Sequence, residues 1–558
     1  MSNTAPSSRA PSSGAPRSLV DLHGRSPWSI LPALCLGFFM IMIDTTIVNI
    51  AVPTLVRSFG ADLTTVGWVN SAYLLTFAVL LLVTGRLGDT FGPKPVFVAG
   101  LVVFTLSSLA CGLSGSIGQL IAARAVQGIG GALMTPQTMS MITRVFPPRQ
   151  RGAALGIWGS VAGVATITGP LLGGILVESV GWQWIFYVNI PVGLVALWFA
   201  LNWLPALERH QRRVDLLGMV LSVLGMFLVV FGLEEGSSYD WGTIRGPVTI
   251  WGVIVLGLLV MVAFGWLQVR RGEDALVPVR LFQNRNFLLA NVAGGAVGFA
   301  MIGIFFPFTL FLQEVAGLSP LRAALISLPS SLVSGVMAPI AGRLSDRVPA
   351  KWVVAFGFVM FIGSITWVSR WIDPAVSPWR LLLPMAFFGL GTSCVFSPLA
   401  NLATSGLDHR TAGAGAGAFN TNRQIGGVIG SAAIVAMLTS RLGRTVPSAA
   451  KDAAASLPEA VRGQFLDRFS HLTGSAFSSG GSSGMPQLPA SVPPAVADQV
   501  KAAALQAVHQ GFATAVAETM LLAVAVFALG LVAALAMHGQ RPERPVAAED
   551  TAAVAATA

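Results

Sequence analysis

The sequence predicts an all-α polytopic membrane protein, organised as two six-helix halves with two further helices between them. Of the 558 residues, 54% are hydrophobic and only 10% are charged, whereas a soluble domain carries about 25% charged residues. Apolar stretches of about 20 residues, the length that a helix needs to cross a bilayer, recur along the chain. Most basic residues lie in the short segments between these stretches, so the net charge of +10 does not indicate a nucleic-acid partner.

Fourteen stretches are long and apolar enough to be transmembrane helices. Because their number is even, both termini are expected on the same side of the membrane. The approximate ranges are 28–50, 65–85, 95–114, 117–142, 152–177, 185–204, 214–234, 247–268, 287–312, 321–343, 351–370, 380–400, 411–439 and 512–537.

The distribution of Arg and Lys predicts the orientation of these spans. If the N-terminus is cytoplasmic, the cytoplasmic loops and tails hold 21 basic residues and the short outer loops hold five. Short cytoplasmic loops carry an excess of Lys and Arg in membrane proteins. We therefore expect both termini in the cytoplasm, and the chain in the cytoplasmic (inner) membrane of a bacterium.

The spacing of the spans divides the chain into five parts. The long segment 440–511 is predicted to be an extracytoplasmic loop, either a mobile insert or a lid or partner site. The five parts are a disordered cytoplasmic tail (1–27), an N-terminal six-helix half (28–204), a linker with two extra spans (205–286), a C-terminal six-helix half (287–537) and a second cytoplasmic tail (538–558).

No enzyme or metal site is indicated by the sequence. None of the four lysines lies in a GK[ST] phosphate loop, the usual means of binding ATP. The three cysteines lack metal-ligand spacing. The GxSxG string at 480–484 lies in a Ser/Gly-rich segment without the strand–turn–helix context of a nucleophile elbow. We therefore expect no cofactor and no catalytic residue.

Two charged residues inside apolar spans predict a proton-coupling site. Asp44 lies in MIDTTIVNIAVP and Arg124 in RAVQGIGGA. An ionisable residue at membrane depth is costly and indicates function. Each lies about 10 Å below the outer surface, at 1.5 Å per residue, so they can pair if their helices are neighbours. Burial favours the neutral carboxyl and a nearby Arg favours the carboxylate. A static ion pair is the alternative interpretation.

Glycines and a proline predict close helix packing in the span 152–177. Gly152, Gly156, Gly159 and Gly163 lie on one face of a helix, and small residues on one face let membrane helices approach closely. The following TGPLLGG holds Gly169, Pro170, Gly173 and Gly174. Packing alone accounts for such a stripe, and so does a bend at an interface between two rocking halves.

Two similar strings imply an internal repeat. TGRLGDTFGPKP (84–95) follows the second span and AGRLSDRVPAKW (341–352) follows the tenth. Asp89 and Asp346 are expected at helix N-termini, and Arg86 and Arg343 are expected to pair across the loop. The residues assigned to conformational control in these strings are Gly85, Arg86, Gly88, Asp89, Lys94, Arg343 and Asp346.

Further polar residues inside the spans are candidates for lining a substrate cavity. Asn420 and Arg423 share a helix face with Gly427 and Gly430, and structural and substrate roles both remain open for Arg423. The candidates are Asn49, Gln127, Asn420, Arg423, Gln424 and Glu518.

Taken together, these motifs resemble those of the major facilitator superfamily, and specifically of its fourteen-span drug:proton antiporter family. MIDTTIVNIAVP resembles the first-helix signature, GRLGDTFGPK the loop motif, RAVQGIGGA the fourth-helix motif and GSVAGVATITGPLLGG the fifth-helix antiporter motif. The resemblance implies two six-helix halves around a central cavity, with the two extra spans at the periphery. It also ties Arg124 to proton coupling.

The function implied is proton-coupled export of lipophilic drugs or antibiotics by alternating access. The partners expected are a small lipophilic substrate, protons and the lipid bilayer, with no nucleic acid, and we expect a monomer. The span 321–343 holds no acidic residue and Arg423 lies within a span, so we expect neutral or weakly acidic substrates. Two alternatives are an importer or facilitator of one metabolite and a non-transporting scaffold or sensor.

Overall fold

A computed structural model describes most of the chain as helices. The predicted tails, apart from residues 25–27 and 538, and the Ser/Gly-rich segment 471–493 lie outside the described residues. The described residues are 25–61, 63–207, 215–236, 239, 241–272, 275–375, 377–404, 407, 411–470 and 494–538.

Helices of the first part of the chain correspond to the predicted N-terminal half. Breaks between them fall at residues that suit a turn: Gly60 and Gly92 take φ values of 60° and 90°, a conformation that favours glycine. The elements are η1 (Pro27–Ile30), α1 (Leu31–Phe59), α2 (Leu63–Phe91), α3 (Pro93–Gly112), α4 (Ile117–Val145), α5 (Pro148–Ser179), α6 (Trp184–Tyr187) and α7 (Asn189–Trp203).

The linker and the second part of the chain follow the same pattern. Two caps start the linker helices, where the side chains of Asp215 and Thr249 accept hydrogen bonds from Gly218 and Gly252. The elements are α8 (Leu216–Glu235), β1 (Thr243–Arg245), β2 (Val248–Thr249), α9 (Ile250–Arg271), α10 (Arg280–Gln283), α11 (Arg285–Leu310), the π-helical turn η3 (Phe311–Val315), α12 (Pro320–Arg347), α13 (Ala350–Trp371), η4 (Pro378–Leu381), α14 (Leu382–Thr404), α15 (Ala412–Ala454), α16 (Glu459–Ser470) and α18 (Pro494–Ala536).

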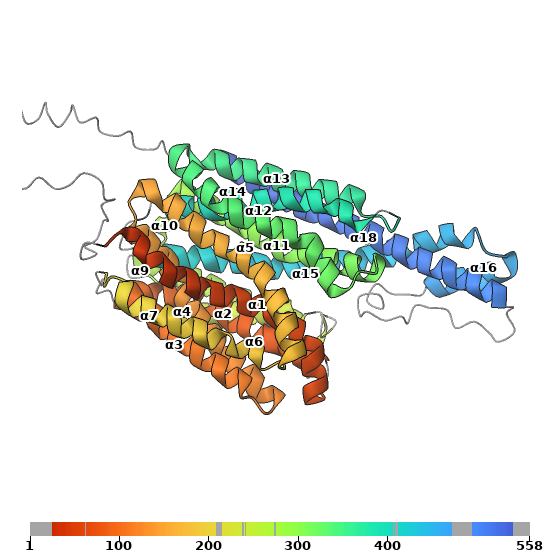
Figure 1. The fold of residues 1–558 in the computed structure, drawn as a ribbon, viewed down its shortest axis with the longest axis horizontal. Helices are drawn as coiled ribbons and strands as arrows, with labels where there is room; N and C mark the ends of the chain where they lie inside the picture. The colour runs from red at the N-terminus through yellow and green to blue at the C-terminus, as the bar shows by residue number, and fades with distance from the viewer. Residues whose placement is uncertain are drawn as a thin grey trace, which may run out of the picture.

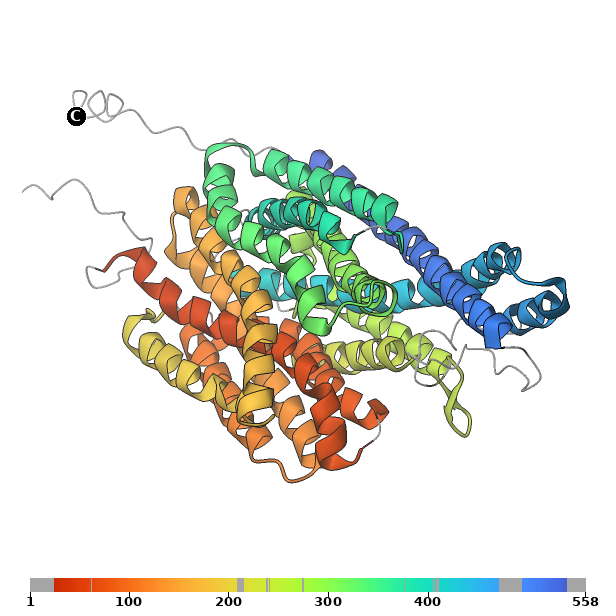
Figure 2. The same cartoon turned by 45° about the vertical axis from the view of Figure 1, so that its right-hand side comes forward.

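Two helix bundles lie side by side (Figures 1 and 2). In one, α1 packs on α5 and α7, and α4 packs on α2 and α3. In the other, α11, α13 and α14 pack with α12, α15 and α18. The two bundles meet along two seams, α5 with α12 and α2 with α15. These are the helices that carry the repeated glycine and Gly-Arg motifs.

The first and last described residues, 25 and 538, lie at one end of the bundle, which we call the terminal end. α1 begins and α18 ends there (Figure 1). The side chain of Asn286 donates to the carbonyl of His538 and accepts from its amide, at 3.2 and 2.8 Å. Nearby along the bundle, Arg25 donates to the carbonyl of Asn202 at 2.8 Å. The first and last described residues therefore lie at the same end of the bundle, and the placing of both termini on one side of the membrane stays a prediction.

Among the described residues, twelve helices are long and apolar enough to cross a membrane. The helices α4 and α5, which the sequence predicted as the fourth and fifth spans, are not among the twelve, although they have 29 and 32 residues. Both contain many Gly, Ser, Thr and Gln residues, and both pack inside the bundle against other long helices. An all-α membrane fold is thus established, and the number of fourteen crossings stays a prediction.

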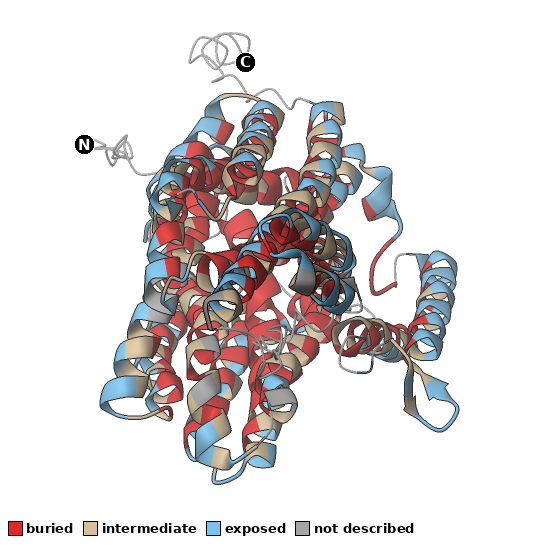
Figure 3. Ribbon diagram, turned by 90° about the vertical axis from the view of Figure 1, so that its right-hand side faces the viewer, coloured by how far each residue is buried: buried red, intermediate tan, exposed pale blue. Residues whose placement is uncertain are grey.

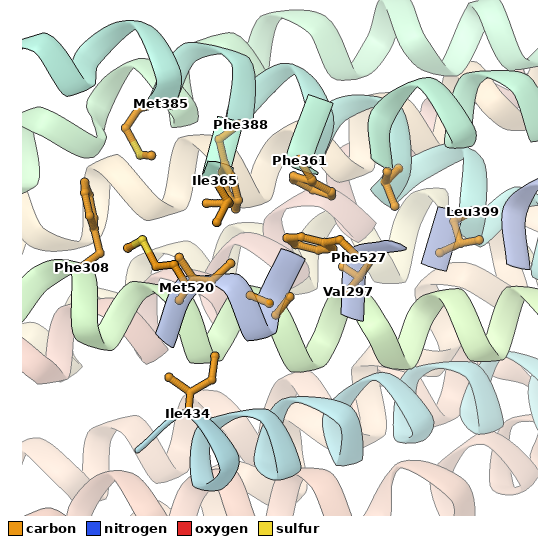
Figure 4. Close-up of a cluster of buried hydrophobic side chains, with 14 of the residues drawn as sticks. Val297, Phe308, Phe361, Ile365, Met385, Phe388, Leu399, Ile434, Met520 and Phe527 are labelled. Atoms are coloured by element: carbon orange, nitrogen blue, oxygen red, sulfur yellow. The ribbon is translucent and has the colours of Figure 1, made fainter. Parts of the chain in front are cut away.

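Apolar side chains fill both bundles and also cover the outside. Figure 3 shows the buried residues along the inner faces of the helices and the exposed ones along the outer faces. In the second bundle, the rings of Phe361 and Phe527 stack at a centroid distance of 4.5 Å beside Phe388 (Figure 4). Exposed apolar residues such as Val262 on α9 face outwards, which suits a lipid environment.

The linker helices α8 and α9 lie at the outside of the bundle, next to the α2–α15 seam. Met226 and Val230 of α8 pack on Leu75 and Val79 of α2. At the start of α8, the buried carboxylate of Asp215 accepts hydrogen bonds from Arg271 and Gln268 of α9. This network ties the two linker helices to each other.

The segment 440–511 differs from the predicted loop. Residues 440–454 continue α15, residues 494–511 begin α18, and α16 lies between them. At 1.5 Å per residue, each 43-residue helix is about 65 Å long, about twice the hydrocarbon thickness of about 30 Å. We call residues 441–470 and 494–511 the arm, which projects at the right of Figure 1. The Ala-rich helical spacing in this segment was visible in the sequence.

Candidate functional site

A buried carboxylate in α1 receives donors from two other helices. Asp44 is fully buried. Its Oδ2 accepts from Nη1 of Arg124 at 2.5 Å, and its Oδ1 accepts from Nε2 of Gln127 at 2.9 Å and from Nδ2 of Asn189 at 3.2 Å. Arg124 and Gln127 lie one turn apart on α4, and Asn189 begins α7. One cation and two amide donors therefore surround the two carboxylate oxygens.

The guanidinium of Arg124 is held from several sides. Its Nε donates to the carbonyl of Val69 at 2.9 Å and its Nη1 to Oε1 of Gln127 at 2.7 Å. Its carbon lies 4.3 Å from the centroid of the Tyr73 ring, a cation–π distance. Nη2 of Arg124 and the hydroxyl of Tyr73 are buried and have no hydrogen-bond partner among the described residues. The site therefore keeps two polar atoms free for a transient partner.

Two residues of α3 complete the network. Oγ of Ser108 accepts from Gln127 at 2.7 Å and from Asn189 at 3.3 Å, and Sγ of Cys111 lies 3.7 Å from Oε1 of Gln127. All of these residues belong to the first bundle. The charged site is thus enclosed by one half of the molecule. Removing one partner of such a buried ion pair costs about 3–5 kcal/mol.

At the terminal end, a second buried carboxylate joins the two halves. Asp89 of α2 accepts from the amides of Gly413 and Ala414, at 3.1 and 2.9 Å, in the first turn of α15. Arg144 of α4 donates to the same carboxylate at 2.7 Å. Negative charge is favourable at a helix N-terminus, and here it comes from the opposite half. Gly85 allows the approach, because a Cβ there would lie 2.7 Å from the carbonyl oxygen of Gly413.

The second seam has the matching contact with the halves exchanged. Asp346 of α12 accepts from the amides of Gly152 and Ala153 in α5, at 2.8 and 2.9 Å. Each half therefore offers one carboxylate, near the end of one long helix, to backbone amides near the start of a helix in the other half. This arrangement matches the two related sequence strings, and we call the two contacts the terminal latch.

Above the latch, α5 and α12 touch along their glycines. A Cβ on Gly156 would lie 2.6 Å from the carbonyl oxygen of Ala338, and one on Gly163 would lie 3.0 Å from that of Ser331. Real Cβ atoms essentially never lie closer than 3.0 Å to such a neighbour. The backbones of the two helices are therefore as near as small residues permit.

Two cavities lie where the halves meet beyond the seam. One is lined by Trp158 of α5, Phe396 of α14, and Asn420 and Arg423 of α15. The other measures about 110 Å³ and lies between Gly159 of α5 and serines of α12 and α14. Phe396 lines both. Pockets for drug-sized ligands measure about 300–1,000 Å³, whereas these two cavities measure about 10 and 110 Å³, so this conformation is closed around a central space.

A family model described as the Major Facilitator Superfamily matches residues 34–431 of the chain. This chain belongs to the Major Facilitator Superfamily. The uncharacterized MFS-type transporter Rv1250 of Mycobacterium tuberculosis is 46% identical over 79% of this chain and 77% of its own length. The tetracenomycin C resistance and export protein of Streptomyces glaucescens is 34% identical over 78% and 80%, respectively.

The arrangement of the helices is also that of this superfamily. The crystal structure of the human organic anion transporter MFSD10 (TETRAN) aligns with a TM-score of 0.56, covering 90% of this chain and 100% of that one. At 12% sequence identity, the likeness shows the fold alone. The sequence-based assignment to the superfamily is confirmed.

Some residues expected at the loop motifs of this superfamily lie elsewhere. Lys94 donates to the carbonyls of Leu201 and Leu204, at 2.9 and 2.7 Å, so it holds the end of α7 and does not contact the other half. Arg343 is exposed and makes no ion pair or hydrogen bond with any described residue, so the structure does not bear out the pairing expected of this residue, whereas the pairing expected of Arg86 stays a prediction. Arg86 is buried at the end of α2.

The glycines of the predicted stripe divide between two partners. Gly159 and Gly163 face the second half, whereas Gly169 and Gly173 pack on Thr46 and Ile47 of α1 within their own half. A Cβ on Gly174 would meet open space, and Gly88 lies against Gln137 of α4. The helix α5 is continuous through Pro170, whose side chain lies outside the described set.

Of the candidates for a substrate cavity, Asn420 and Arg423 line the first cavity. Gln127 belongs instead to the Asp44 network. Glu518 pairs with Arg441 of the arm at 2.7 Å, and Gln424 lines neither described cavity. Asn49 lies in α1, and its side chain is outside the described set.

Several residues of the site were missed from the sequence. Asn189 lies in WQWIFYVNIPVG and Ser108 in an apolar span, and a polar residue in such a span was a usable signal. Arg144 was counted only as a loop charge, yet it pairs with Asp89. Three serines of α12 in SLPSSLVSG (327–335), Ser330, Ser331 and Ser334, line the second cavity.

Proposed function

We propose that the chain is a proton-coupled exporter of lipophilic compounds that works by alternating access. The observation that carries this proposal is the buried Asp44–Arg124 pair within one half of a Major Facilitator transporter. The relatives named for antibiotic resistance and export support the choice of export. No bound cofactor is needed, since the proton gradient supplies the energy.

Asp44 is the proposed proton carrier. In the described conformation, three donors stabilise its charged form. Protonation removes that charge, so the carboxyl no longer compensates the buried guanidinium of Arg124. An uncompensated buried charge is strongly unfavourable, and the first half must then rearrange. The free Nη2 of Arg124 can then donate a new hydrogen bond, and the hydroxyl of Tyr73 can donate or accept one.

An aromatic contact connects this site to the central cavities. Phe38 lies six residues before Asp44 on α1, about 9 Å along the helix axis. Its ring stacks on Trp158 of α5 at a centroid distance of 4.1 Å, and Trp158 lines the first cavity. A movement of α1 on protonation would therefore reach the wall of the cavity through one packed pair of rings.

The cycle follows from these parts. With the terminal latch formed, the cavity is shut towards the terminal end, which we place in the cytoplasm of a bacterial inner membrane. Substrate leaves on the outer side and Asp44 takes up a proton there. The halves then rock about the glycine seam, the latch opens, the proton leaves inwards and new substrate enters. One chain contains all of these parts, so we propose a monomer.

Efflux measurements test the proposal. A bacterium that lacks its own drug pumps expresses the wild type, Asp44→Asn, or Asp452→Asn, which neutralises an exposed carboxylate of the arm. The cells are loaded with a fluorescent lipophilic dye, and efflux is followed with and without a protonophore, with expression checked by immunoblot. We expect at least tenfold slower efflux for Asp44→Asn and for protonophore-treated wild type, and near wild-type efflux for Asp452→Asn.

Other outcomes point to the other candidate functions. Efflux that survives both Asp44→Asn and the protonophore contradicts coupling through this carboxylate. Uptake in place of efflux would indicate an importer or facilitator. If a dye panel is not moved and the phenotype of a deletion strain is restored by Asp44→Asn, a scaffold or sensor is the better interpretation.

A further inference from the structure

We propose that the central cavity recognises planar aromatic compounds that carry an anionic group, with Arg423 as the partner of the anion and with Trp158 and Phe396 as stacking surfaces. The proposal rests on the proposed function, because it names the substrate class of that transporter. It is carried by the unpaired groups that line the cavity.

Arg423 is partly buried between the helices and differs from the paired arginines Arg124 and Arg144. Arg124 and Arg144 are each paired with a carboxylate, Asp44 and Asp89. Arg423 makes no ion pair or hydrogen bond with any residue that the structure describes, and its guanidinium lies 4.8 Å from the centroid of the Phe396 ring. A cation inside the bundle without a counter-ion is costly. An anionic ligand would remove that cost.

Trp158 is a second donor without an acceptor. Its side chain is 2% exposed, and its Nε1 has no hydrogen-bond partner among the described residues. Buried indole N–H groups normally find an acceptor. The cavity therefore presents one buried donor without an acceptor and one partly buried cation without a counter-ion, and its described lining includes no carboxylate. This set of groups suits a ligand that supplies acceptor atoms and negative charge.

The aromatic rings of the cavity are arranged for a flat ligand. Trp158 of the first half and Phe396 of the second have centroids 6.2 Å apart and ring planes 27° apart. Rings in van der Waals contact are separated by about 3.5–4.0 Å, so a ring inserted between them needs about 7–8 Å. A separation of the halves by an ångström or two would admit it. The serine-lined cavity beyond Phe396 offers uncharged space for the rest of the molecule.

The geometry ranks ligands by charge. An aromatic anion gains the stacking surfaces and pairs with Arg423. A neutral ligand of the same shape gains only the stacking surfaces, and an aromatic cation is repelled by Arg423, the only charged residue in the described lining of either cavity. Asp44 does not change this order, because its oxygens are occupied by donors within the first half.

A matched series of probes tests this order. 2-Naphthoate, 2-naphthamide and 2-naphthamidine share one ring system and carry charges of −1, 0 and +1 near neutral pH. Their binding to the purified full-length chain in detergent is measured by isothermal titration calorimetry and by the shift of the unfolding temperature. We expect the naphthoate to bind at least tenfold more tightly than either of the other two, the effect of one charge-assisted hydrogen bond.

Variants assign the preference to Arg423. Arg423→Gln should remove the preference for naphthoate while the affinity for naphthamide stays within about threefold, and Arg423→Lys should keep part of the preference. Trp158→Leu should weaken all three ligands. Arg441→Gln, on the same helix but paired with Glu518, is the control and should bind like the wild type. The unfolding temperature of each ligand-free variant shows whether it is folded.

The outcomes separate this inference from the proposed function. Equal or tighter binding of naphthamide or naphthamidine to the wild type overturns the inference, as does a preference that survives Arg423→Gln, or no binding of any probe at millimolar concentration. The wild-type comparison needs no variant to fold. Binding in detergent needs no proton gradient, so a preference for naphthoate without gradient-driven efflux would sustain the substrate class and reject proton coupling.

Discussion

At the scale of single residues, the Asp44 site shows what depth along a span can and cannot predict. Asp44 and Arg124 were matched by their distance from the outer ends of their spans, and the structure brings them together at 2.5 Å. Gln127, three residues after Arg124, was assigned to a substrate cavity but donates to Asp44. Residue numbers give depth, whereas the direction in which a helix face points depends on packing with its neighbours.

The donor Asn189 should support transport by holding the carboxylate of Asp44. In Asn189→Ala, this carboxylate loses one of its three donors, so the network around it is held less firmly. A hydrogen bond to a charged group contributes about 1.5–3 kcal/mol, and this one is long at 3.2 Å. We expect the rate of efflux to fall about tenfold, where about 1.4 kcal/mol corresponds to a factor of ten.

This loss is measured as the initial rate of transport in everted vesicles. Asn202→Ala is the control, because Asn202 lies on the same helix, is exposed and its side chain donates to the carbonyl of Trp198 in that helix. An unchanged rate in Asn189→Ala would contradict a role of this amide in holding the carboxylate.

At the scale of elements, the latch is built from helix ends. Asp89 and Asp346 each bind two amides of a helix in the opposite half. The sequence predicted that both would lie at helix N-termini. The first amides of a helix have no partner within that helix and favour a negative charge, and an Asp at the end of a span is placed to reach such amides. The sequence could not predict that the helices capped belong to the other half, because that depends on how the two bundles pack.

Asp346→Ala should open the latch. The variant loses two hydrogen bonds between Asp346 and α5 at 2.8 and 2.9 Å, and hydrogen bonds to charged groups contribute about 1.5–3 kcal/mol each in favourable cases. We expect the conformation that is closed at the terminal end to lose at least tenfold in relative population. The measurement is the alkylation rate of a cysteine placed at Ala153, with Cys35, Cys111 and Cys394 replaced by alanine.

In the described conformation, Ala153 is buried in the seam between α5 and α12, so alkylation at this position reports the opening of the seam. Asp452→Ala, in the arm, serves as the control and should leave the rate unchanged. Equal alkylation rates with and without the Asp346 carboxylate would show that the latch does not hold this conformation closed.

The seam between α5 and α12 should tolerate no added methyl group. In Gly156→Ala, the new Cβ would lie 2.6 Å from the carbonyl oxygen of Ala338, a backbone atom, so one helix must move. Overpacking of this kind costs about 1–3 kcal/mol, and we expect at least a tenfold loss of efflux. Gly174→Ala, on the same helix and facing open space, should retain wild-type efflux; equal loss in both variants would point to helix propensity and not to the seam.

At the scale of the whole molecule, hydropathy predicted the helix bundle but not the helical arm. The apolar spans gave the all-α membrane fold, because a backbone inside lipid must satisfy its own hydrogen bonds. The arm was interpreted as a loop since its residues are too polar to span a bilayer. Leu442 and Val446 nevertheless continue the buried face of α15, and Thr445 donates to the carbonyl of Gly511 on α18 at 2.7 Å. Helix length is set here by packing between two helices, not by the membrane.

The orientation of the molecule decides which side the latch closes. The excess of 21 basic residues over five predicts that the terminal end is cytoplasmic, so the described conformation would be shut to the cytoplasm and the arm would project outside. A green fluorescent protein fused after Ala558 should then be fluorescent, and a cysteine replacing the exposed Glu459 of α16 should react with a membrane-impermeant maleimide in intact cells. A dark fusion together with an unreactive cysteine would invert the molecule. An antiporter exchanges an inward-moving proton for an outward-moving substrate in either orientation, so inversion would change the side that the latch closes and not the direction of export.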